Sequence, residues 1–226
     1  MPTKMSVWAG FTAAIVVLST ACGSPPESGV ARGEFLYKQC IACHMEDGSG
    51  LEVIGAPAIA GMPAWYVEAQ LVKYQDGIRG AHPDDVEGLR MRPMSRLLFS
   101  YDRGGKVNAE GTKLNRQTIA AYVEKMPKTP PRDSLTGGDA VKGKTYFATC
   151  TACHGADAGG NKALNAPPLS ASSDWYLLNQ LKKFKSGVRG ANPKDVTGAQ
   201  MRPMSMTLPD EQAMKDVIAY IRTLSK

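Results

Sequence analysis

The chain of 226 residues repeats itself at a distance of 110 residues, and this internal repeat limits its fold more than any other feature. Shifting the sequence by 110 aligns residues 40–95 with residues 150–205 without a gap, and 26 of the 56 aligned positions are identical. Tyr122 and Tyr220 then align at an offset of 98, so the first copy holds 110 − 98 = 12 extra residues. The sequence predicts two similar halves, with an inserted surface loop or hairpin within residues 96–110.

The most specific element of the repeat is the pentapeptide Cys-x-x-Cys-His, which reads CIACH at residues 40–44 and CTACH at residues 150–154. Short disulfides, a thioredoxin-like redox pair or a zinc site would explain the cysteine pairs, but none of them requires a histidine directly after the second cysteine. Covalent haem attachment requires all three residues, because the cysteines form thioethers and the histidine binds the iron. We therefore expect two haem c groups, attached at Cys40, Cys43, Cys150 and Cys153, with His44 and His154 as iron ligands.

A second axial ligand is expected from methionine rather than from histidine. Besides the two motif histidines the chain has only His82, whose counterpart in the repeat is Asn192, so His82 is expected to be a solvent-facing loop residue. The pentapeptide MRPMS, in contrast, occurs at residues 91–95 and again at residues 201–205. Methionine thioether raises the potential of electron-transfer haems. The repeat predicts one methionine ligand per half, in a proline-containing loop before the last helix: either Met91 and Met201, or Met94 and Met204.

The N-terminal segment has the features of an export signal. One basic residue, Lys4, precedes an apolar run from Val7 to Leu18, which is short for a membrane span. Small residues follow directly before Cys22, which suits either simple cleavage or a lipoprotein site at that cysteine. We expect a protein exported to the periplasmic side and anchored to the membrane surface by lipidation of Cys22, with simple secretion or an uncleaved anchor as the alternatives.

The remaining pattern is helical, with a linker between the repeats. Residues 126–138 carry three prolines and a glycine pair without helical periodicity. Apolar residues recur at helical spacing in residues 64–76, 113–125, 174–186 and 210–224, and strand patterns are nearly absent, so we expect an all-α fold. Gly33 and Gly143 are expected to allow close crossing of the first and last helices of each half. The predicted organisation is a signal peptide at 1–21, a tether at 22–29, a first domain at 30–126, a linker at 127–138 and a second domain at 139–226.

From about residue 30 to residue 226 the chain resembles diheme class I cytochromes c of the cytochrome c4 type. The resemblance lies in the two haem motifs, the segment WYLLNQLKKFKSGVRG at residues 175–190 and the methionine segment before a final helix. Residues 184–201 also resemble cytochrome c domains fused to haem-copper oxidase subunits. The resemblance implies two tandem class I cytochrome c domains, each a few helices wrapped around a covalently bound haem.

The same resemblance favours one of the two methionine pairs. In that family the ligand methionine lies seven residues before the leucine that opens the last helix. Leu208 takes that place in the second half, which indicates Met201, and the repeat then indicates Met91. The first half shows no clean equivalent of Leu208.

Two six-coordinate haems leave no open iron position, so we expect an electron carrier rather than an enzyme. Its expected partners are respiratory redox proteins, namely an upstream quinol-oxidising complex and a terminal oxidase or reductase. The alternative is an electron-accepting subunit of a periplasmic dehydrogenase or sulfur-oxidising complex. Arg79 and Arg189 are expected to contact haem propionates, with a solvated loop as the alternative. Trp65 and Trp175 are expected to pack near the haems, with core filling as an equal alternative.

Charge restricts the class of partner. The formal net charge of +6 becomes +5 without residues 1–21, because Lys4 is their only charged residue. No run of basic residues is present, so nucleic acid is not an expected partner. A modestly basic carrier is expected to dock on an acidic patch of a redox protein, with association that weakens as salt is added.

Overall fold

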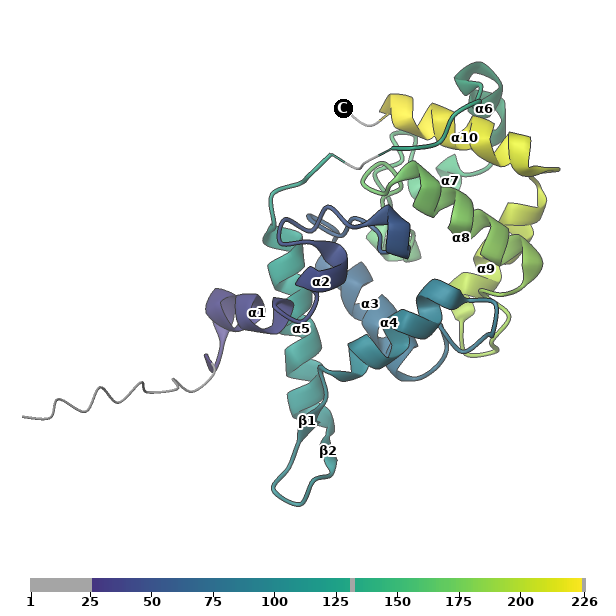
Figure 1. Cartoon of the computed structure of the whole chain (residues 1–226). Helices are drawn as coiled ribbons and strands as arrows, with labels where there is room; N and C mark the ends of the chain where they lie inside the picture. The colour runs from purple at the N-terminus through teal and green to yellow at the C-terminus, as the bar shows by residue number, and fades with distance from the viewer. Residues whose placement is uncertain (1–25, 131–132, 225–226) are drawn as a thin grey trace, which may run out of the picture.

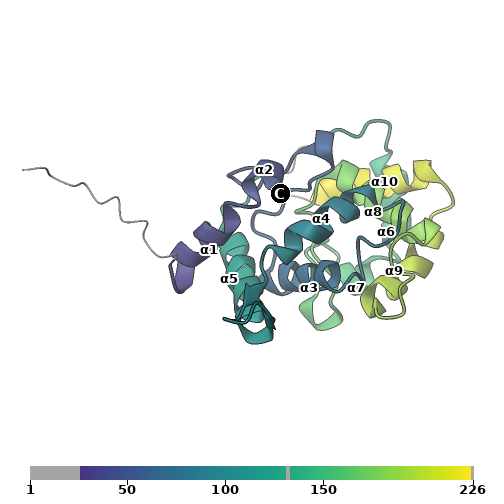
Figure 2. The same ribbon diagram turned by 60° about the horizontal axis from the view of Figure 1, so that its bottom comes forward.

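The two sequence repeats form two helical halves that are joined by an extended segment (Figure 1). The computed structural model describes residues 26–130 and 133–224, and the N-terminal signal, Cys22 and part of the linker lie outside them. Figures 1 and 2 both show the first half, in purple to teal, packed along one side of the second half, in green to yellow. None of the helices within the described residues is long and apolar enough to cross a membrane.

The elements of the two halves follow one another in the same order. The first half consists of α1 (Gly29–Tyr37), α2 (Ile41–His44), the 3-10 helix η1 (Glu52–Ile54), α3 (Ala64–Gln75), α4 (Val86–Arg96), β1 (Ser100–Tyr101), β2 (Val107–Asn108) and α5 (Ala109–Lys125). The second half consists of α6 (Ala140–Phe147), α7 (Thr151–His154), η2 (Lys162–Leu164), α8 (Asp174–Ser186), α9 (Val196–Met206) and α10 (Glu211–Leu224). The predicted all-α fold is confirmed.

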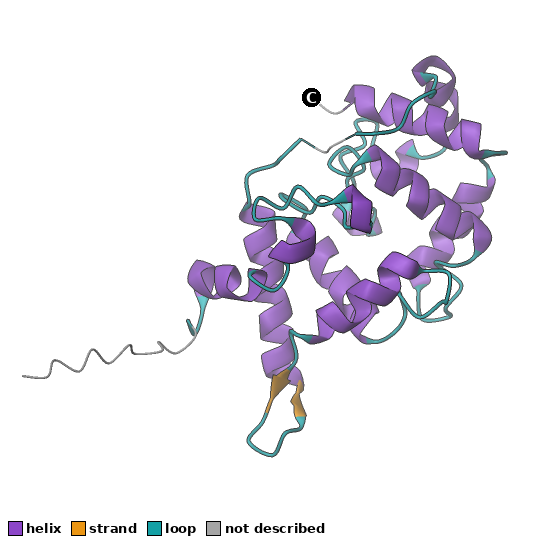
Figure 3. Cartoon of the chain, viewed as in Figure 1, coloured by secondary structure: helices purple, strands orange, loops and turns teal. Residues whose placement is uncertain are grey.

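The insertion in the first half is a hairpin, as expected. Ser100 pairs with Asn108 and Tyr101 with Val107 in an antiparallel register. Figure 3 shows these strands in orange, projecting away from the helices below the start of α5. They form the only sheet among the described residues. The hairpin ends directly in α5, because the side chain of Asn108 accepts a hydrogen bond from Gly111 N at 2.9 Å and caps this helix.

Each half is closed by a tight crossing of its first and last helices, as the glycines predicted. A Cβ atom placed on Gly33 of α1 would lie 2.6 Å from the Cβ of Tyr122 on α5. A Cβ atom on Gly143 of α6 would lie only 1.9 Å from the backbone oxygen of Asp216 on α10. Any larger residue would force these helices apart. Behind the crossings lie two separate apolar cores, one centred on Leu36, Ile119 and Val123 and the other on Phe147, Val217 and Ile218.

Both MRPMS segments lie inside helices, which corrects the expectation of a loop. Residues 91–95 belong to α4 and residues 201–205 to α9. Asp85 fixes the start of α4 because its side chain accepts a hydrogen bond from Gly88 N at 3.2 Å, and Asp195 caps α9 in the same way. A proline inside a helix removes one backbone hydrogen bond without ending a helix that is well anchored at its N-terminus. The methionines therefore sit on capped helices.

Candidate cofactor site

The two Cys-x-x-Cys-His motifs occupy equivalent places, in the short helices α2 and α7. Each histidine is buried, and its Nδ1 atom lies within hydrogen-bonding distance of a proline carbonyl: 2.9 Å from Pro57 O for His44 and 2.8 Å from Pro167 O for His154. A carbonyl oxygen only accepts, so Nδ1 carries the hydrogen and the neutral ring keeps its lone pair on Nε2. Burial lowers the pKa of both histidines, which keeps them neutral and able to bind a metal.

The motif cysteines do not have the character of redox-active thiols. Burial, followed by the neighbouring thiol of Cys43, raises the pKa of Cys40 to about 11. Burial likewise raises the pKa of Cys150. A thioredoxin-like pair needs a thiol whose pKa is lowered, so that it is a thiolate near neutral pH. The environment of these cysteines therefore disfavours the redox-pair alternative and suits thiols that are consumed by thioether formation.

A cavity in the first half brings the motif and the methionines together. Cys40, Cys43 and His44 line it, and so do Met91 and Met94 of α4. Two thiols, a neutral imidazole and a thioether in one cavity are the groups that attach and ligate a haem c. The other walls are mainly apolar, as a porphyrin ring requires; they include Leu36, Leu71, Leu98, Ile119 and Val123.

Within each MRPMS segment the first methionine is the more deeply placed. Met94 and Met204 are 38% and 43% exposed, whereas Met91 and Met201 are only partly exposed and Met91 packs against the core of the first half. The two methionines of a pair are three residues apart and so share a helix face. This difference in burial agrees with the preference for Met91 and Met201, since a thioether that binds iron is shielded from water.

The first half does contain an equivalent of Leu208. Leu98 lies 110 residues before Leu208 and seven residues after Met91, and both leucines are 4% exposed. Each follows directly after its methionine helix, with a backbone hydrogen bond back to the serine of MRPMS. The gap-free alignment therefore extends past residue 95, and Leu98 corrects the expectation that the first half lacks this leucine. The alignment of Leu98 with Leu208 was visible in the sequence, but Leu98 lies within the segment that contains the insertion.

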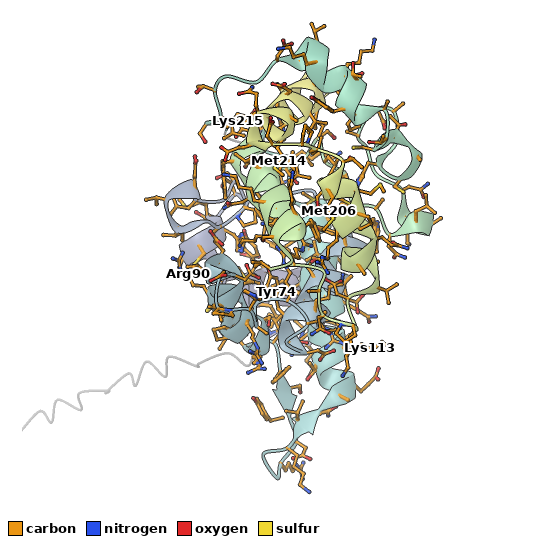
Figure 4. The ribbon with its side chains drawn as sticks, turned by 90° about the vertical axis from the view of Figure 1, so that its right-hand side faces the viewer. Tyr74, Arg90, Lys113, Met206, Met214 and Lys215 are labelled. Atoms are coloured by element: carbon orange, nitrogen blue, oxygen red, sulfur yellow. The ribbon has the colours of Figure 1, made fainter. Side chains whose placement is uncertain are left out.

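Arg79 and Arg189 lie at the junction between the two halves. Arg79 donates to Gln70 of its own half at 2.9 Å and to Tyr176 and Gln180 of the other half at 3.0 and 2.9 Å. Arg189 mirrors this arrangement, because it donates to Gln180 of its own half and to Gln70 of the other. Both guanidinium groups also stack on an aromatic ring, which for Arg79 is Tyr74 at 4.7 Å. Figure 4 labels Tyr74 where the two halves meet.

These two arginines are buried charges whose hydrogen-bond partners are all neutral. Among the described residues neither guanidinium is hydrogen-bonded to a carboxylate, and the Nε atom of each is buried without a partner. A buried charge is costly unless it is paired and hydrogen-bonded, and the nearby Asp85 carboxylate acts on Arg79 only through its charge. Burial alone would raise the pKa of Tyr176, but the guanidinium groups of Arg79 and Arg189 outweigh it and lower that pKa. Arg79 also lines the cavity, and a guanidinium group there can pair with a carboxylate of a bound porphyrin.

Two lysines cross the junction and were not predicted from the sequence. Lys73 of the first half lies 2.5 Å from Asp195 Oδ1 of the second. Lys183 of the second half lies 2.6 Å from Asp85 Oδ1 of the first, and it also binds Glu87. Lys73 and Lys183 occupy equivalent positions of the repeat, as do the two aspartates. The sequence shows that both copies have the same lysine and the same aspartate at these positions. No local pattern indicated that each lysine would pair with the aspartate of the opposite half.

The tryptophans and His82 lie away from the centre of the cavity. Trp65 and Trp175 each form an edge-to-face contact with the next residue, Tyr66 or Tyr176, and these tyrosines rather than the tryptophans line the first cavity. Trp175 is buried and borders a second pocket between the halves, together with Glu87 and Arg90. His82 is exposed in the loop before α4. Haem packing by the tryptophans stays a prediction.

A family model and several known proteins match this chain. The cytochrome c family model matches residues 30–127 and 140–225. A thiosulfate dehydrogenase electron acceptor from Stutzerimonas stutzeri is 27% identical over 199 residues, which are 79% of this chain and 82% of that protein. The oxidase subunit FixP of a cbb3-type cytochrome c oxidase from Sinorhizobium medicae is 29% identical over 174 residues, which are 72% of this chain and 53% of that protein.

The fold also matches a solved structure. A cytochrome c4 from Acidithiobacillus ferrooxidans superposes with a TM-score of 0.60 at 24% identity, over 84% of this chain and 99% of that one. At this identity the likeness concerns the fold. It agrees with the order of elements in the two halves, because a two-domain protein is matched along almost its full length.

Proposed function

Because this chain belongs to the cytochrome c family, whose model covers both halves, we propose that it is an exported two-haem protein that carries single electrons between respiratory redox proteins. The chain is an electron carrier rather than an enzyme, it consists of two tandem cytochrome c domains, and membership of the family implies covalently bound haem c. The observation that supports the proposal most is that a neutral, correctly oriented histidine and a partly buried methionine occur in both halves.

In this proposal each half holds one haem with residues from three elements. The thioether bonds form at Cys40 and Cys43 in the first half, and at Cys150 and Cys153 in the second. His44 and His154 supply Nε2, Met91 and Met201 supply the thioether sulfur, and Arg79 and Arg189 contact propionates. The haem supplies reversible one-electron chemistry at iron. The histidine and the methionine of each half would hold the iron, and apolar side chains would surround the ring, which would keep small molecules from the iron.

The ligand assignment is tested by single substitutions in the purified holoprotein. We expect Met91→Ala and Met201→Ala each to remove about half of the long-wavelength charge-transfer absorbance of methionine-ligated ferric haem. Met94→Ala and Met204→Ala serve as matched controls, because they change the other methionine of the same helix face. Loss of absorbance in the control variants instead would assign the ligands to Met94 and Met204. A high-spin spectrum of the parent protein would contradict the carrier function.

A second candidate function is that of the electron-accepting partner of a dehydrogenase. It is favoured by the similarity to the thiosulfate dehydrogenase electron acceptor of Stutzerimonas stutzeri, which spans most of both chains. The two candidates differ in where electrons enter. Mixing the oxidised holoprotein with thiosulfate and a purified thiosulfate dehydrogenase would give rapid haem reduction under the second candidate. No reduction on the timescale of turnover, together with oxidation of the reduced protein by a terminal oxidase, would favour the first.

The partner surface that fits the charge of the chain is acidic. Helix α4 carries Arg90 and Arg96 on its exposed side, and Figure 4 shows Arg90 at the edge of the first half. Exposed positive charges around a haem cavity steer an acidic partner and make association sensitive to salt. Electron transfer to the partner should therefore slow as ionic strength rises. A rate that is independent of salt would contradict docking on an acidic patch.

The location outside the cytoplasm rests on the N-terminal sequence, which lies outside the described residues. We propose export through the signal at residues 1–21, with Cys22 lipidated and residues 22–29 as a tether. One acyl chain holds a protein only weakly, so a stable anchor needs a second signal. Metabolic labelling with a palmitate analogue should mark the parent protein and not Cys22→Ser. An unlabelled parent protein would leave simple secretion.

A further inference from the structure

The crossed lysines bind at a particular place, the N-cap of the helix that carries the methionines. Asp85 Oδ1 accepts from Gly88 N at 3.2 Å and so caps α4, and Asp85 Oδ2 accepts from Gly80 N at 3.2 Å. The ammonium group of Lys183 donates to the same Oδ1 atom at 2.6 Å. A residue of the second half therefore holds the carboxylate that begins the methionine helix of the first half.

The opposite crossing repeats this arrangement. Asp195 Oδ1 caps α9 by accepting from Gly198 N at 3.1 Å, and Lys73 of the first half donates to that atom at 2.5 Å. Lys73 also donates to Thr197 Oγ1 at 2.6 Å. Thr197 is equivalent to Glu87, which Lys183 binds in the other crossing. Because the same crossed contact occurs at both caps, these lysines are not accidental surface ion pairs.

These ion pairs affect stability strongly because they are buried. Asp85 and Asp195 are 2% and 1% exposed, and the side chains of Lys183 and Lys73 are 11% and 14% exposed. Exposed ion pairs contribute little, but a charge that loses its partner inside the protein is strongly destabilising. Removal of Lys183 would leave the Asp85 carboxylate buried beside Gly80 and Gly88 without its cation. The cap, and with it the first turns of α4, would have to move.

The displaced cap is connected to the axial ligand by one short helix. Met91 lies six residues after Asp85 on the same helix, and Met201 lies six residues after Asp195. Axial ligation depends on placing the sulfur within bonding distance of iron, and small displacements of a supporting group loosen a ligand. Lys183 itself lines the cavity of the first half. Lys183 is therefore connected to Met91 through the Asp85 cap and the first turns of α4.

We propose that Lys183 and Lys73 are positioning residues that act across the junction: Lys183 holds Met91 of the first half in place, and Lys73 holds Met201 of the second. This inference rests on the proposed methionine ligation. The proposal means that docking of the two halves and binding of the methionines to iron are coupled, so that loss of one weakens the other. Each haem site is then completed by the other half, although no side chain of that half binds its iron.

The test uses the full-length holoprotein with one methionine ligand silenced. In a Met201→His background the methionine charge-transfer band reports the first half alone, and in a Met91→His background it reports the second half alone. Lys183→Met and Lys73→Met replace each lysine by an unbranched side chain that is one atom shorter and carries no charge. Each is introduced into both backgrounds, and the loss of the band with rising pH is followed in the ferric protein. Lys182→Met is the matched control, because Lys182 is the neighbouring lysine of α8 and forms an exposed pair with Glu211.

The expected pattern is crossed. Lys183→Met should increase the fraction of first-half haem that lacks its methionine by about tenfold at a given pH, the size typical of coupling within one hydrogen-bond network. It should leave the second half unchanged. Lys73→Met should do the reverse, and Lys182→Met should change neither. An effect of Lys183→Met on its own half, on both halves equally, or on neither would overturn the proposal.

Two further variants separate positioning from general loss of structure. Lys183→Arg keeps the charge and should restore the band towards that of the parent. Asp85→Asn keeps a side chain that caps helices well but removes the carboxylate, so it should loosen the methionine of the first half as Lys183→Met does. Far-ultraviolet circular dichroism checks the fold of each variant. Absence of the band from the parent protein would overturn the ligand assignment and this inference together, whereas a band unmoved by the crossed lysines would overturn only the inference.

Discussion

The two halves of the molecule are alike inside and different outside. Both place a histidine against a proline carbonyl, both cap the methionine helix with an aspartate, and both send a lysine across the junction. On the outer face, Leu89 of α4 and Leu97 directly after it are exposed, where the second half has Ala199 of α9 and Thr207 directly after it. The first half also carries the projecting hairpin between α4 and α5. The difference teaches that the two copies share their interior contacts while their outer surfaces differ.

The largest effect is expected from removing the cysteines of one half, which tests whether each half binds its haem independently of the other. Replacing Cys40 and Cys43 by alanine should remove one haem and leave the other, and replacing Cys150 and Cys153 should do the same for the second half. The reason is that each pair of thioethers forms within its own half. The pyridine haemochrome assay should therefore give half of the parent haem content for either double variant. Complete loss of haem from one of them would show that one half depends on the other for attachment.

The helix crossings should differ in their tolerance of a methyl group. In Gly143→Ala the new Cβ meets a backbone oxygen at 1.9 Å, whereas in Gly33→Ala it meets the side chain of Tyr122 at 2.6 Å. A backbone clash can be relieved only by moving a helix, so we expect a loss of unfolding free energy of about 4 kcal/mol for Gly143→Ala and about 2 kcal/mol for Gly33→Ala. Guanidinium unfolding of the holoprotein, followed by circular dichroism, measures both. Equal losses would contradict the difference between the crossings.

The crossed ion pairs should also differ between the halves. Asp195→Asn leaves Lys73 with Thr197 as its polar partner, whereas Asp85→Asn leaves Lys183 still bound to Glu87. A buried lysine without a carboxylate costs more, so we expect losses of about 3 kcal/mol for Asp195→Asn and about 2 kcal/mol for Asp85→Asn. The free energies of unfolding at pH 7 provide the measurement. A larger loss for Asp85→Asn would mean that Glu87 does not compensate.

Acid should abolish the cost of Asp85→Asn. Burial alone would raise the pKa of Asp85, but the hydrogen bond and charge of Lys183 outweigh it and lower that pKa. A carboxyl group whose folded pKa is depressed contributes stability above its unfolded pKa, near 3.8, and that stability is lost as the pH falls through the folded value. The difference in unfolding free energy between parent and Asp85→Asn should therefore be full at pH 7 and shrink below about pH 4. A constant difference would contradict the pairing with Lys183.

The smallest expected effect concerns the outer surfaces. Leu97→Thr gives the end of α4 the residue that follows α9 at the equivalent position, so it makes the first half resemble the second. If partners dock on the larger apolar face of α4, the second-order rate of electron transfer should fall by about threefold, with unchanged haem spectra. Thr207→Ser on α9 is the matched control and should leave the rate unchanged. A fall for Thr207→Ser alone would place docking on the second half.

The features that the sequence predicted are those encoded by local chemistry or by identity between the copies. Cys-x-x-Cys-His and the glycines of the helix crossings fall in this class, because their spacing alone carries their meaning. The junction was not predictable, since Lys73 finds Asp195 at a distance of 122 residues and only the docking of the halves brings them together. The methionine segments were misread for a different reason. Proline usually marks a loop, but the capping aspartate upstream outweighs it.

The crossed contacts have a consequence for how the two halves associate. Lys73 binds Asp195 of the other half, and the equivalent Lys183 binds the equivalent Asp85, which is the reciprocal pattern of an isologous interface between two identical subunits. Here both sides of that interface belong to one polypeptide. The covalent connection makes their association independent of protein concentration, and each half can carry a different outer face.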